Sequence, residues 1–212
     1  SYPQRTSKYE EVEIDGIKVD YYDAKNKVIH EIKKSNKVDK AHELSNTLPD
    51  AKAVDEIMGI EGNIRQAYYA AFDIILDDFN MGSRTKQPPE NEVNALISFG
   101  NMMCYTETLR AVHQTQLNPT ISFLHTPGER RFSLCLDISE IFKPIIVDRV
   151  IFKVLNKHAL STSHFDKKLN KCLLNEKGKK IFVKAMEERY DETFRHRSLG
   201  RNVSYKHLIK LE

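Results

Sequence analysis

The sequence predicts a mainly α-helical protein whose first 43 residues hold a short β-hairpin segment. Residues 11–22 alternate polar and apolar side chains, which is typical of paired strands, with a turn at Asp15-Gly16. From about residue 50 the apolar residues recur at helical spacing instead, as in the series Ile64, Tyr68, Ala71, Phe72, Ile75, Leu76 and Phe79. This change of pattern predicts a boundary near residues 43–50.

The elements follow in order along the chain. In the β part, a second turn at 23–27 precedes a short strand at 28–33, and residues 37–43 are suited to open a helix. Gly82 and Pro88-Pro89 then break the helical pattern, which resumes from Asn91 through Val112.

The second half of the chain is also predicted to be helical. Ser133 to Phe142 forms a helix that Pro144 interrupts and restarts, since proline suits a first helical turn. Residues 147–155 continue this helix. Residues 163–190 are predicted to form two shorter helices on either side of Asn175–Gly178.

Length and composition limit the classes of protein. A chain of 212 residues fits one large domain or two small ones, and 40% apolar with 30% charged residues excludes a mainly disordered chain. No run of 18 apolar residues occurs, so no membrane span is expected. The cysteines, Cys104, Cys135 and Cys172, are odd in number and form no CxxC pair, so neither a disulfide framework nor a zinc site is indicated. A reducing cytosol is the expected location.

The net charge of +3 is too small to indicate a nucleic-acid binder, but basic residues gather in two places. Such clusters can meet phosphates, and each is also compatible with an ordinary solvated surface. The first comprises Lys167, Lys168, Lys171, Lys177, Lys179, Lys180 and Lys184, and the second Arg195, His196, Arg197, Arg201, Lys206, His207 and Lys210.

Candidate metal ligands stand at three places in the helical part. Glu61 begins a helix, His125 lies in a loop, and Asp137 and Glu140 are spaced to leave one helix face among apolar neighbours. One histidine with carboxylates suits a labile Mg²⁺ or Mn²⁺. By spacing alone, a dipole-stabilising glutamate, a structural histidine and a solvated acidic pair explain the same residues.

The stretch from about Leu44 to Glu212, about 80% of the chain, resembles the C-terminal helical domain of the CRISPR-associated integrase, the universal spacer-acquisition endonuclease. The matching strings stand in the family's order. They are EIMGIEGNIRQAYYAAFD, RTKQPPENEVNALISFGNMMCY, QLNPTISFLHTPGERRFSLCLDISEIFKPIIVDRVIFKVLNK and RHRSLGRNVSYKHLIKLE. The resemblance implies a helical catalytic domain over residues 44–212.

The resemblance also implies site residues. The family's metal-binding glutamate falls on Glu61, its histidine on His125 and its third ligand on Glu140, with Asp137 supporting the metal or the DNA. The implied cofactor is Mg²⁺ or Mn²⁺. The implied reaction is transesterification, in which the 3′-hydroxyl of a prespacer end attacks a phosphodiester of the CRISPR array. Expected DNA contacts are Arg65, Arg84, Lys86, Tyr105, Arg130 and Arg131.

Residues 1–43 resemble a different family, the CRISPR-associated RecB-type exonuclease that trims prespacers. The string GIKVDYYDAKNKVIHEIKKSNKVDKAHE places Asp20 on one strand, with Glu31 and Lys33 on the next in an ExK pattern. The resemblance implies that Asp20 and Glu31 bind a metal and that Lys33 is catalytic. That family carries a 4Fe–4S cluster on four cysteines, none of which lies in residues 1–43. A fused nuclease and integrase with missing regions, joined near Glu43-Leu44, would account for both resemblances.

Partners follow from the same resemblances. They are double-stranded DNA, as prespacer and as CRISPR array, a second copy in a homodimer, and a small ferredoxin-like Cas protein that bridges two dimers. The prespacer-trimming nuclease is expected to be fused or bound. The family's N-terminal β-sandwich domain is not visible in this sequence. A non-catalytic DNA-binding or assembly subunit is the alternative function, and a single-strand exonuclease alone is a third.

Overall fold

The structure is a computed structural model, and it describes residues 9–14, 17–22, 43, 47, 54–122, 132–196 and 199–211. The chain divides into two compact units, Ser1–Ile75 and Leu76–Glu212, and each is described by itself. Among the described residues, most of the helices and most of the buried apolar side chains belong to the second unit, and Ala71 and Phe72 are buried in the first. The predicted junction near Glu43-Leu44 separates two family resemblances, not two compact units. The division into units therefore does not test it, and it stays a prediction.

The first unit contains the predicted hairpin. Strands β1 (Tyr9–Ile14) and β2 (Ile17–Tyr22) pair antiparallel, with Ile14 opposite Ile17 and Asp20 opposite Glu11. This confirms the strand pair predicted for residues 11–22. The predicted strand at 28–33 and the helix start at 37–43 lie outside the described residues, apart from Glu43. A two-stranded hairpin occurs in many folds, so the nuclease interpretation of residues 1–43 stays a prediction.

The helical part of the first unit consists of α3 (Val54–Tyr69) and the single turn α4 (Phe72–Ile75). An aromatic cluster holds this end of the unit together, because the Phe72 ring meets those of Tyr68 and Tyr69 edge-on, with centroids 5.5 and 5.3 Å apart. The helical spacing that the sequence shows up to Phe79 therefore overstates the helix, which ends at Ile75.

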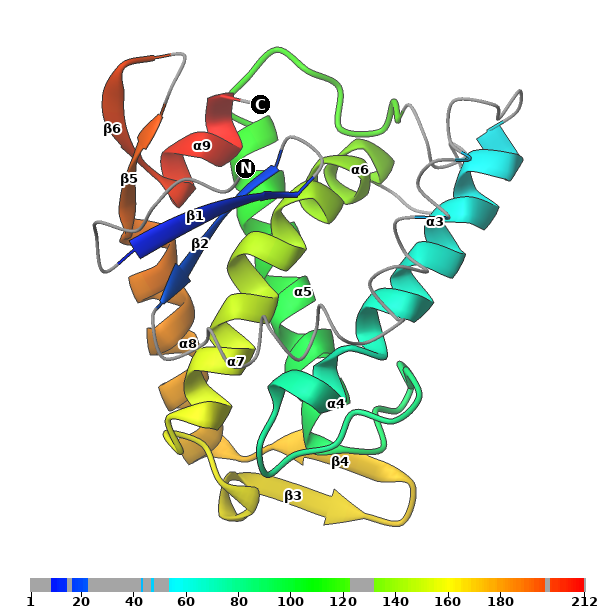
Figure 1. The fold of residues 1–212 in the computed structure, drawn as a ribbon. Coiled ribbons are helices and arrows are strands. Elements are labelled where there is room, and N and C mark those ends of the chain that lie inside the picture. The colour runs from blue at the N-terminus through cyan, green and yellow to red at the C-terminus, as the bar shows by residue number, and fades with distance from the viewer. Residues whose placement is uncertain are drawn as a thin grey trace. The chain divides into compact units, whose positions relative to one another are not determined.

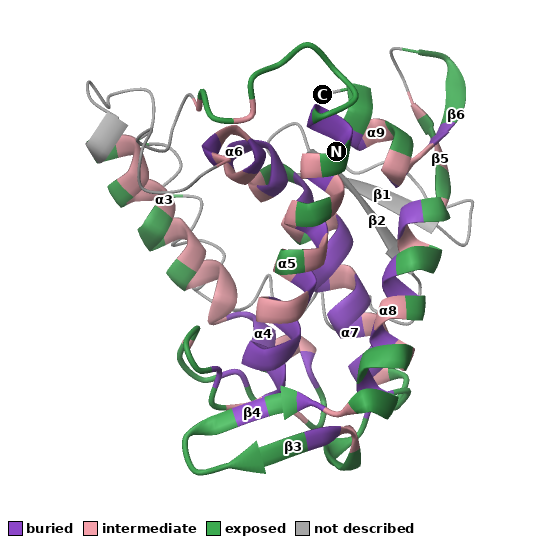
Figure 2. Cartoon of the chain, turned by 180° about the vertical axis from the view of Figure 1, so that it is seen from behind, coloured by how far each residue is buried: buried purple, intermediate pink, exposed green. Residues whose placement is uncertain are grey.

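The second unit is built on α5 (Glu92–Val112), which confirms the predicted helix. Asn91 caps it, because its side chain accepts a hydrogen bond from the Asn94 amide at 2.8 Å. The helix begins shortly after Pro88-Pro89 in the chain, and most residues of its first two turns are buried. Helices α7 and α8 run beside it, and the residues between them form the core (Figure 2).

The helix predicted from Ser133 continues through Pro144 without a break. It consists of α6 (Ser133–Phe142), a π-helical segment η3 (Lys143–Asp148) and α7 (Arg149–Asn156). A proline inside a helix lacks an amide donor and crowds the preceding turn, and the wider π-helical turn accommodates it. Pro144 thus changes the helix type locally, where the sequence predicted an interruption and restart.

The two helices predicted for residues 163–190 are wrong in their first half. A 3₁₀ turn η4 (Thr162–His164) leads into a hairpin of β3 (Phe165–Lys168) and β4 (Lys171–Leu174), and one helix, α8 (Glu176–Asp191), follows. Phe165 pairs opposite Leu174 and both are buried, so the hairpin buries apolar side chains at its base. Asn170 adopts a left-handed backbone (φ 59°) in the two-residue turn.

The chain ends in a hairpin, β5 (Thr193–His196) with β6 (Arg201–Ser204), and in helix α9 (Tyr205–Leu211). Arg189 of α8 connects this end to the core. Its guanidinium donates to the Ile145 carbonyl through Nε (3.1 Å) and Nη2 (2.7 Å), and it lies 4.0 Å from the centre of the Tyr205 ring. Figure 1 shows α9 beside the upper end of α5.

The predicted fold class is confirmed at the level of a helix-rich chain with a few short strands. Each sheet formed by the described residues has only two strands. None of the helices in the described part of the chain is long and apolar enough to cross a membrane.

Candidate metal and DNA-binding site

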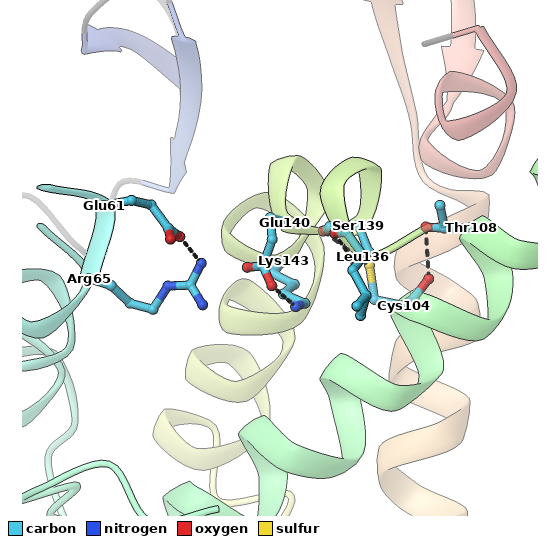
Figure 3. A network of polar contacts seen from close by, with 8 residues as sticks. All are labelled: Glu61, Arg65, Cys104, Thr108, Leu136, Ser139, Glu140 and Lys143. Carbon is cyan, nitrogen blue, oxygen red and sulfur yellow. Dashed lines mark hydrogen bonds and ion pairs between the residues drawn. The ribbon is translucent and has the colours of Figure 1, made fainter. Parts of the chain in front are cut away.

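Glu61 lies in the middle of α3 rather than at its start, on a half-exposed face. Its carboxylate forms an ion pair with the guanidinium of Arg65 one turn further on (Figure 3). The side chains of Glu61 and Arg65 are 39% and 35% exposed. The carboxylate is therefore accessible, and its charge is balanced by its own helix.

Two glycines flank Glu61 within the same helix. A Cβ placed on Gly59 or Gly62 meets no atom within 4 Å in the described part of the first unit. Glycine in a helix interior costs roughly 0.5–1 kcal/mol relative to alanine. A larger residue would therefore fit at either position within the unit. The two glycines leave the helix surface beside Glu61 without side chains, and they lower the stability of the helix.

Asp137 and Glu140 lie one turn apart on α6 and differ in burial. Asp137 is buried, whereas the side chain of Glu140 is 24% exposed. Glu140 forms an ion pair with Lys143, the first residue of η3 (Figure 3). Lys143 is not among the predicted site residues, although its spacing of three residues from Glu140 is typical of an ion pair on a helix. Glu61 and Glu140 thus each have a basic partner three or four residues further along the chain.

The helix that carries Glu140 is fixed against α5. The Cys104 thiol lies 3.9 Å from the Ser139 carbonyl, and the Thr108 hydroxyl donates to the Cys104 carbonyl at 3.0 Å. Burial raises the pKa of the Cys104 thiol to about 12, with Lys143 opposing the shift and Glu140 adding to it. Cys104 therefore stays protonated at neutral pH, which makes its thiol a poor nucleophile.

Arg84, predicted to contact DNA, is hydrogen-bonded to α5. Its guanidinium donates to Asn94 Oδ1 at 2.9 Å and to the Ser98 hydroxyl at 3.1 Å. Asn94 is fully buried, and its amide group donates to the Ser83 carbonyl at 2.9 Å while its oxygen also accepts from the Thr85 amide at 3.1 Å. These hydrogen bonds of Arg84 and Asn94 hold the segment before α5 in place. The sequence did not predict them.

The remaining predicted site residues divide into two groups. Lys86 is exposed in the segment before α5, and Tyr105 is half-buried on α5. The others, His125, Arg130, Arg131, Glu31 and Lys33, lie outside the described residues, and Asp20 is placed only as a position on β2. The predicted ligands Glu61 and Glu140 belong to different units. The assembly of the predicted metal site therefore stays a prediction.

The donors that are described suit a hard divalent cation. Within the described ranges no three His, Cys, Asp or Glu side chains are grouped closely enough to hold a metal. Glu61 and Glu140 each offer an accessible carboxylate that lies beside a basic side chain, Arg65 or Lys143. Carboxylate oxygens are suitable ligands for Mg²⁺ or Mn²⁺. An iron–sulfur cluster held by four cysteines does not fit this chain, which has three, Cys104, Cys135 and Cys172.

Residues 18–188 match the protein family described as CRISPR associated protein Cas1. The "CRISPR-associated endonuclease Cas1 2" of Thermodesulfovibrio yellowstonii is 49% identical over 194 residues, which are 91% of this chain and 57% of the relative. The structure of a CAS1 protein from Thermotoga maritima is similar with a TM-score of 0.76 and 41% identity, over 82% of this chain and 54% of that one.

A more distant likeness concerns the fold alone. A casposase bound to an integration product matches with a TM-score of 0.72 at 22% identity, over 80% of this chain and 51% of that chain. The chain spans about half the length of the curated relatives it matches. The family match begins at residue 18, inside the segment that the sequence analysis assigned to a nuclease.

Proposed function

The chain belongs to the family of CRISPR-associated protein Cas1, and we propose that it supplies the catalytic helical domain of a metal-dependent DNA endonuclease and integrase of CRISPR adaptation. The observation that carries this proposal is the intact pair of accessible carboxylates, Glu61 and Glu140, on two helices of a chain 49% identical to an endonuclease of the family. The fold shared with a casposase that was bound to an integration product is consistent with it.

Glu61, His125 and Glu140 would hold Mg²⁺ or Mn²⁺, with Asp137 supporting the ligands. When bound, such a cation lowers the pKa of the attacking hydroxyl and stabilises the negative charge that develops on the phosphate. In the proposed reaction the 3′-oxygen of the prespacer forms a bond to phosphorus and the bond from phosphorus to the 3′-oxygen of the array strand breaks. The attacking hydroxyl gives its proton to water, and the leaving 3′-oxygen takes up a proton from water. No covalent enzyme intermediate is needed.

The two basic partners of the carboxylates then take on a second role. While no cation occupies the site, Arg65 and Lys143 neutralise Glu61 and Glu140. A divalent cation on the carboxylates would compete for the same oxygens and release a guanidinium and an ammonium group. Both groups are suited to hold the phosphate oxygens of the DNA. Lys86, Tyr105, Arg84, Arg130 and Arg131 are the further proposed DNA contacts.

The proposed partners are double-stranded DNA, a second copy of the chain in a homodimer, and a small ferredoxin-like Cas protein bridging two dimers. We also propose that residues 1–43 belong to a prespacer-trimming nuclease, with Asp20, Glu31 and Lys33 as its site residues. The family match to residues 18–43 offers a competing assignment. Lys33→Ala separates them: the nuclease assignment requires loss of overhang trimming with normal integration of pre-trimmed DNA.

A strand-transfer assay tests the main proposal. A labelled prespacer with free 3′-hydroxyls is mixed with a supercoiled repeat-bearing plasmid, Mn²⁺ and the small partner protein, using the longest native polypeptide. Wild type is expected to join label to plasmid, whereas Glu61→Ala and His125→Ala are expected to join none while keeping their helical content. Equal joining by His125→Ala would refute the site. Binding without joining by wild type would favour the alternative, a non-catalytic DNA-binding or assembly subunit.

A further inference from the structure

A strongly basic surface lies at the end of the second unit opposite α9, on the β3–β4 hairpin and the start of α8 (Figures 1 and 2). Residues 165–184 contain seven lysines but only two acidic residues, Asp166 and Glu176. All of these lysines are exposed. Within the second unit, none of these lysines lies on α6, the helix that carries Asp137 and Glu140.

Two of the seven lysines, Lys167 and Lys179, form ion pairs within the chain. Lys167 Nζ lies 2.7 Å from Glu92 Oε1 on α5, and Glu92 holds the pKa of Lys167 above its usual value. The Cys172 amide donates to the Pro89 carbonyl at 2.8 Å, which fixes the hairpin to the segment before α5. Lys179 Nζ lies 2.7 Å from Glu176 Oε1. The hairpin is therefore held against the segment before α5, and the charges of Lys167 and Lys179 are largely balanced by their acidic partners.

The other five lysines have no ion pair in the part of the chain that the structure describes, and we call them the lysine surface. Lys168 and Lys171 face each other at the hairpin tip, beside Leu169, which is 94% exposed. Nothing in the described part covers this tip. The complete set is Lys168, Lys171, Lys177, Lys180 and Lys184.

One lysine of α8, Lys177, is placed where helix stability disfavours it. The free amide groups of the first helical turn carry partial positive charge, so cations are unfavourable there. Glu176 is the acidic residue of that turn, and Lys179 already pairs with it. Lys177 therefore repels the helix end without an ion pair in the described part of the chain, whereas Lys180 lies beyond that turn and helps to lower the pKa of Glu176. The position of Lys177 points to a negatively charged partner outside the chain.

We propose that the lysine surface binds the phosphate backbone of duplex DNA; this rests on the proposed DNA-joining function and extends it. The strands of the hairpin each span ~13 Å, and Lys177 to Lys184 span ~10 Å along α8. The charges thus follow an extended track. Lysine ammonium groups without an accompanying base-reading side chain bind phosphates irrespective of sequence.

The test is a fluorescence anisotropy titration of a random-sequence DNA duplex with the full chain, in EDTA, over a series of KCl concentrations. The double variant Lys168→Gln/Lys171→Gln is expected to bind more weakly and to lower the slope of log K against log salt by about 1.8, because each lost phosphate contact removes about 0.9. The control Lys179→Gln removes one positive charge from an ion-paired lysine and is expected to change the slope by less than half of the value for one contact.

A second variant separates DNA binding from folding. Lys177→Glu replaces an unfavourable charge at the start of α8 with a favourable one, so the melting temperature is expected to rise while duplex affinity falls about tenfold or more. An unchanged salt slope in both test variants would overturn the proposal, as would binding of anionic lipid vesicles in preference to duplex DNA. Strand transfer by wild type is measured alongside: its failure counts against the proposed function, whereas normal transfer with unchanged slopes counts only against the lysine surface.

Discussion

Glu140 of α6 forms an ion pair with Lys143, the residue at which the helix passes into its π-helical segment, and the side chains are 24% and 14% exposed. Glu61 and Arg65 repeat this arrangement on α3. In both cases a carboxylate proposed to bind a divalent cation is neutralised by a basic residue of its own helical segment. The carboxylates can therefore stay partly buried before metal binds.

Replacement of Lys143 tests this relationship. Lys143→Met removes a cation that competes with metal for Glu140, so half-maximal strand transfer is expected at a lower Mn²⁺ concentration. The maximal rate is expected to fall about tenfold, because an ammonium group proposed to hold phosphate is lost. Lys153→Met is the matched control, since Lys153 faces Glu188 and Glu192 at 3.6 and 3.7 Å instead. An unchanged Mn²⁺ dependence in Lys143→Met would contradict the interpretation.

Two glycine substitutions are expected to act in opposite directions. Gly62→Ala should stabilise α3 by about 0.5–1 kcal/mol, since a Cβ there meets no atom within 4 Å in the described part of its unit. Gly100→Ala should destabilise the second unit by about 1–3 kcal/mol, because its Cβ would lie 2.4 Å from Val147 Cγ1. Urea unfolding followed by circular dichroism measures both, and equal signs would refute the packing described for α5.

The cysteines are expected to resist thiol reagents in the folded protein. Cys104, Cys135 and Cys172 are buried, and burial raises the pKa of each thiol, that of Cys104 to about 12. Because the thiolate is the reactive form, a colorimetric thiol reagent at pH 8 should react slowly with native protein and rapidly with all three cysteines in denaturant. Fast reaction of any cysteine under native conditions would show that its site is open.

Asn94 and Arg84 allow a structural role to be distinguished from DNA binding. Asn94→Ala removes a buried side chain that serves Arg84, Thr85 and Ser83, and it is expected to cost about 2–3 kcal/mol of unfolding free energy. Arg84→Gln should also destabilise the protein. If Arg84 additionally contacts phosphate, Arg84→Gln will lower the salt slope of duplex binding by about 0.9, while Asn94→Ala, measured below its melting temperature, will not.

The elements that the sequence predicted well are those whose pattern is long and local. Helix α5 shows its apolar spacing over 21 residues, and Asn91 marks its start. The hairpin β1–β2 shows alternation over two strands of six residues. By contrast, β3 and β4 have four residues each, too few to display a period, and their apolar residues are separated by lysines. They pair because Phe165 and Leu174 are buried at the base of the hairpin.

The sequence by itself determined the family, because the strings that carry the resemblance are continuous along the chain, and it supplied Glu61, His125 and Glu140 as the proposed metal ligands. It did not show which charged groups are already engaged. That depended on residues distant in sequence: Glu92 reaches Lys167, and Arg84 reaches Asn94 and Ser98. A lysine or arginine has the same sequence signature whether it is paired or free, and only the packing of hairpin, helix and loop decides which cations remain available to DNA.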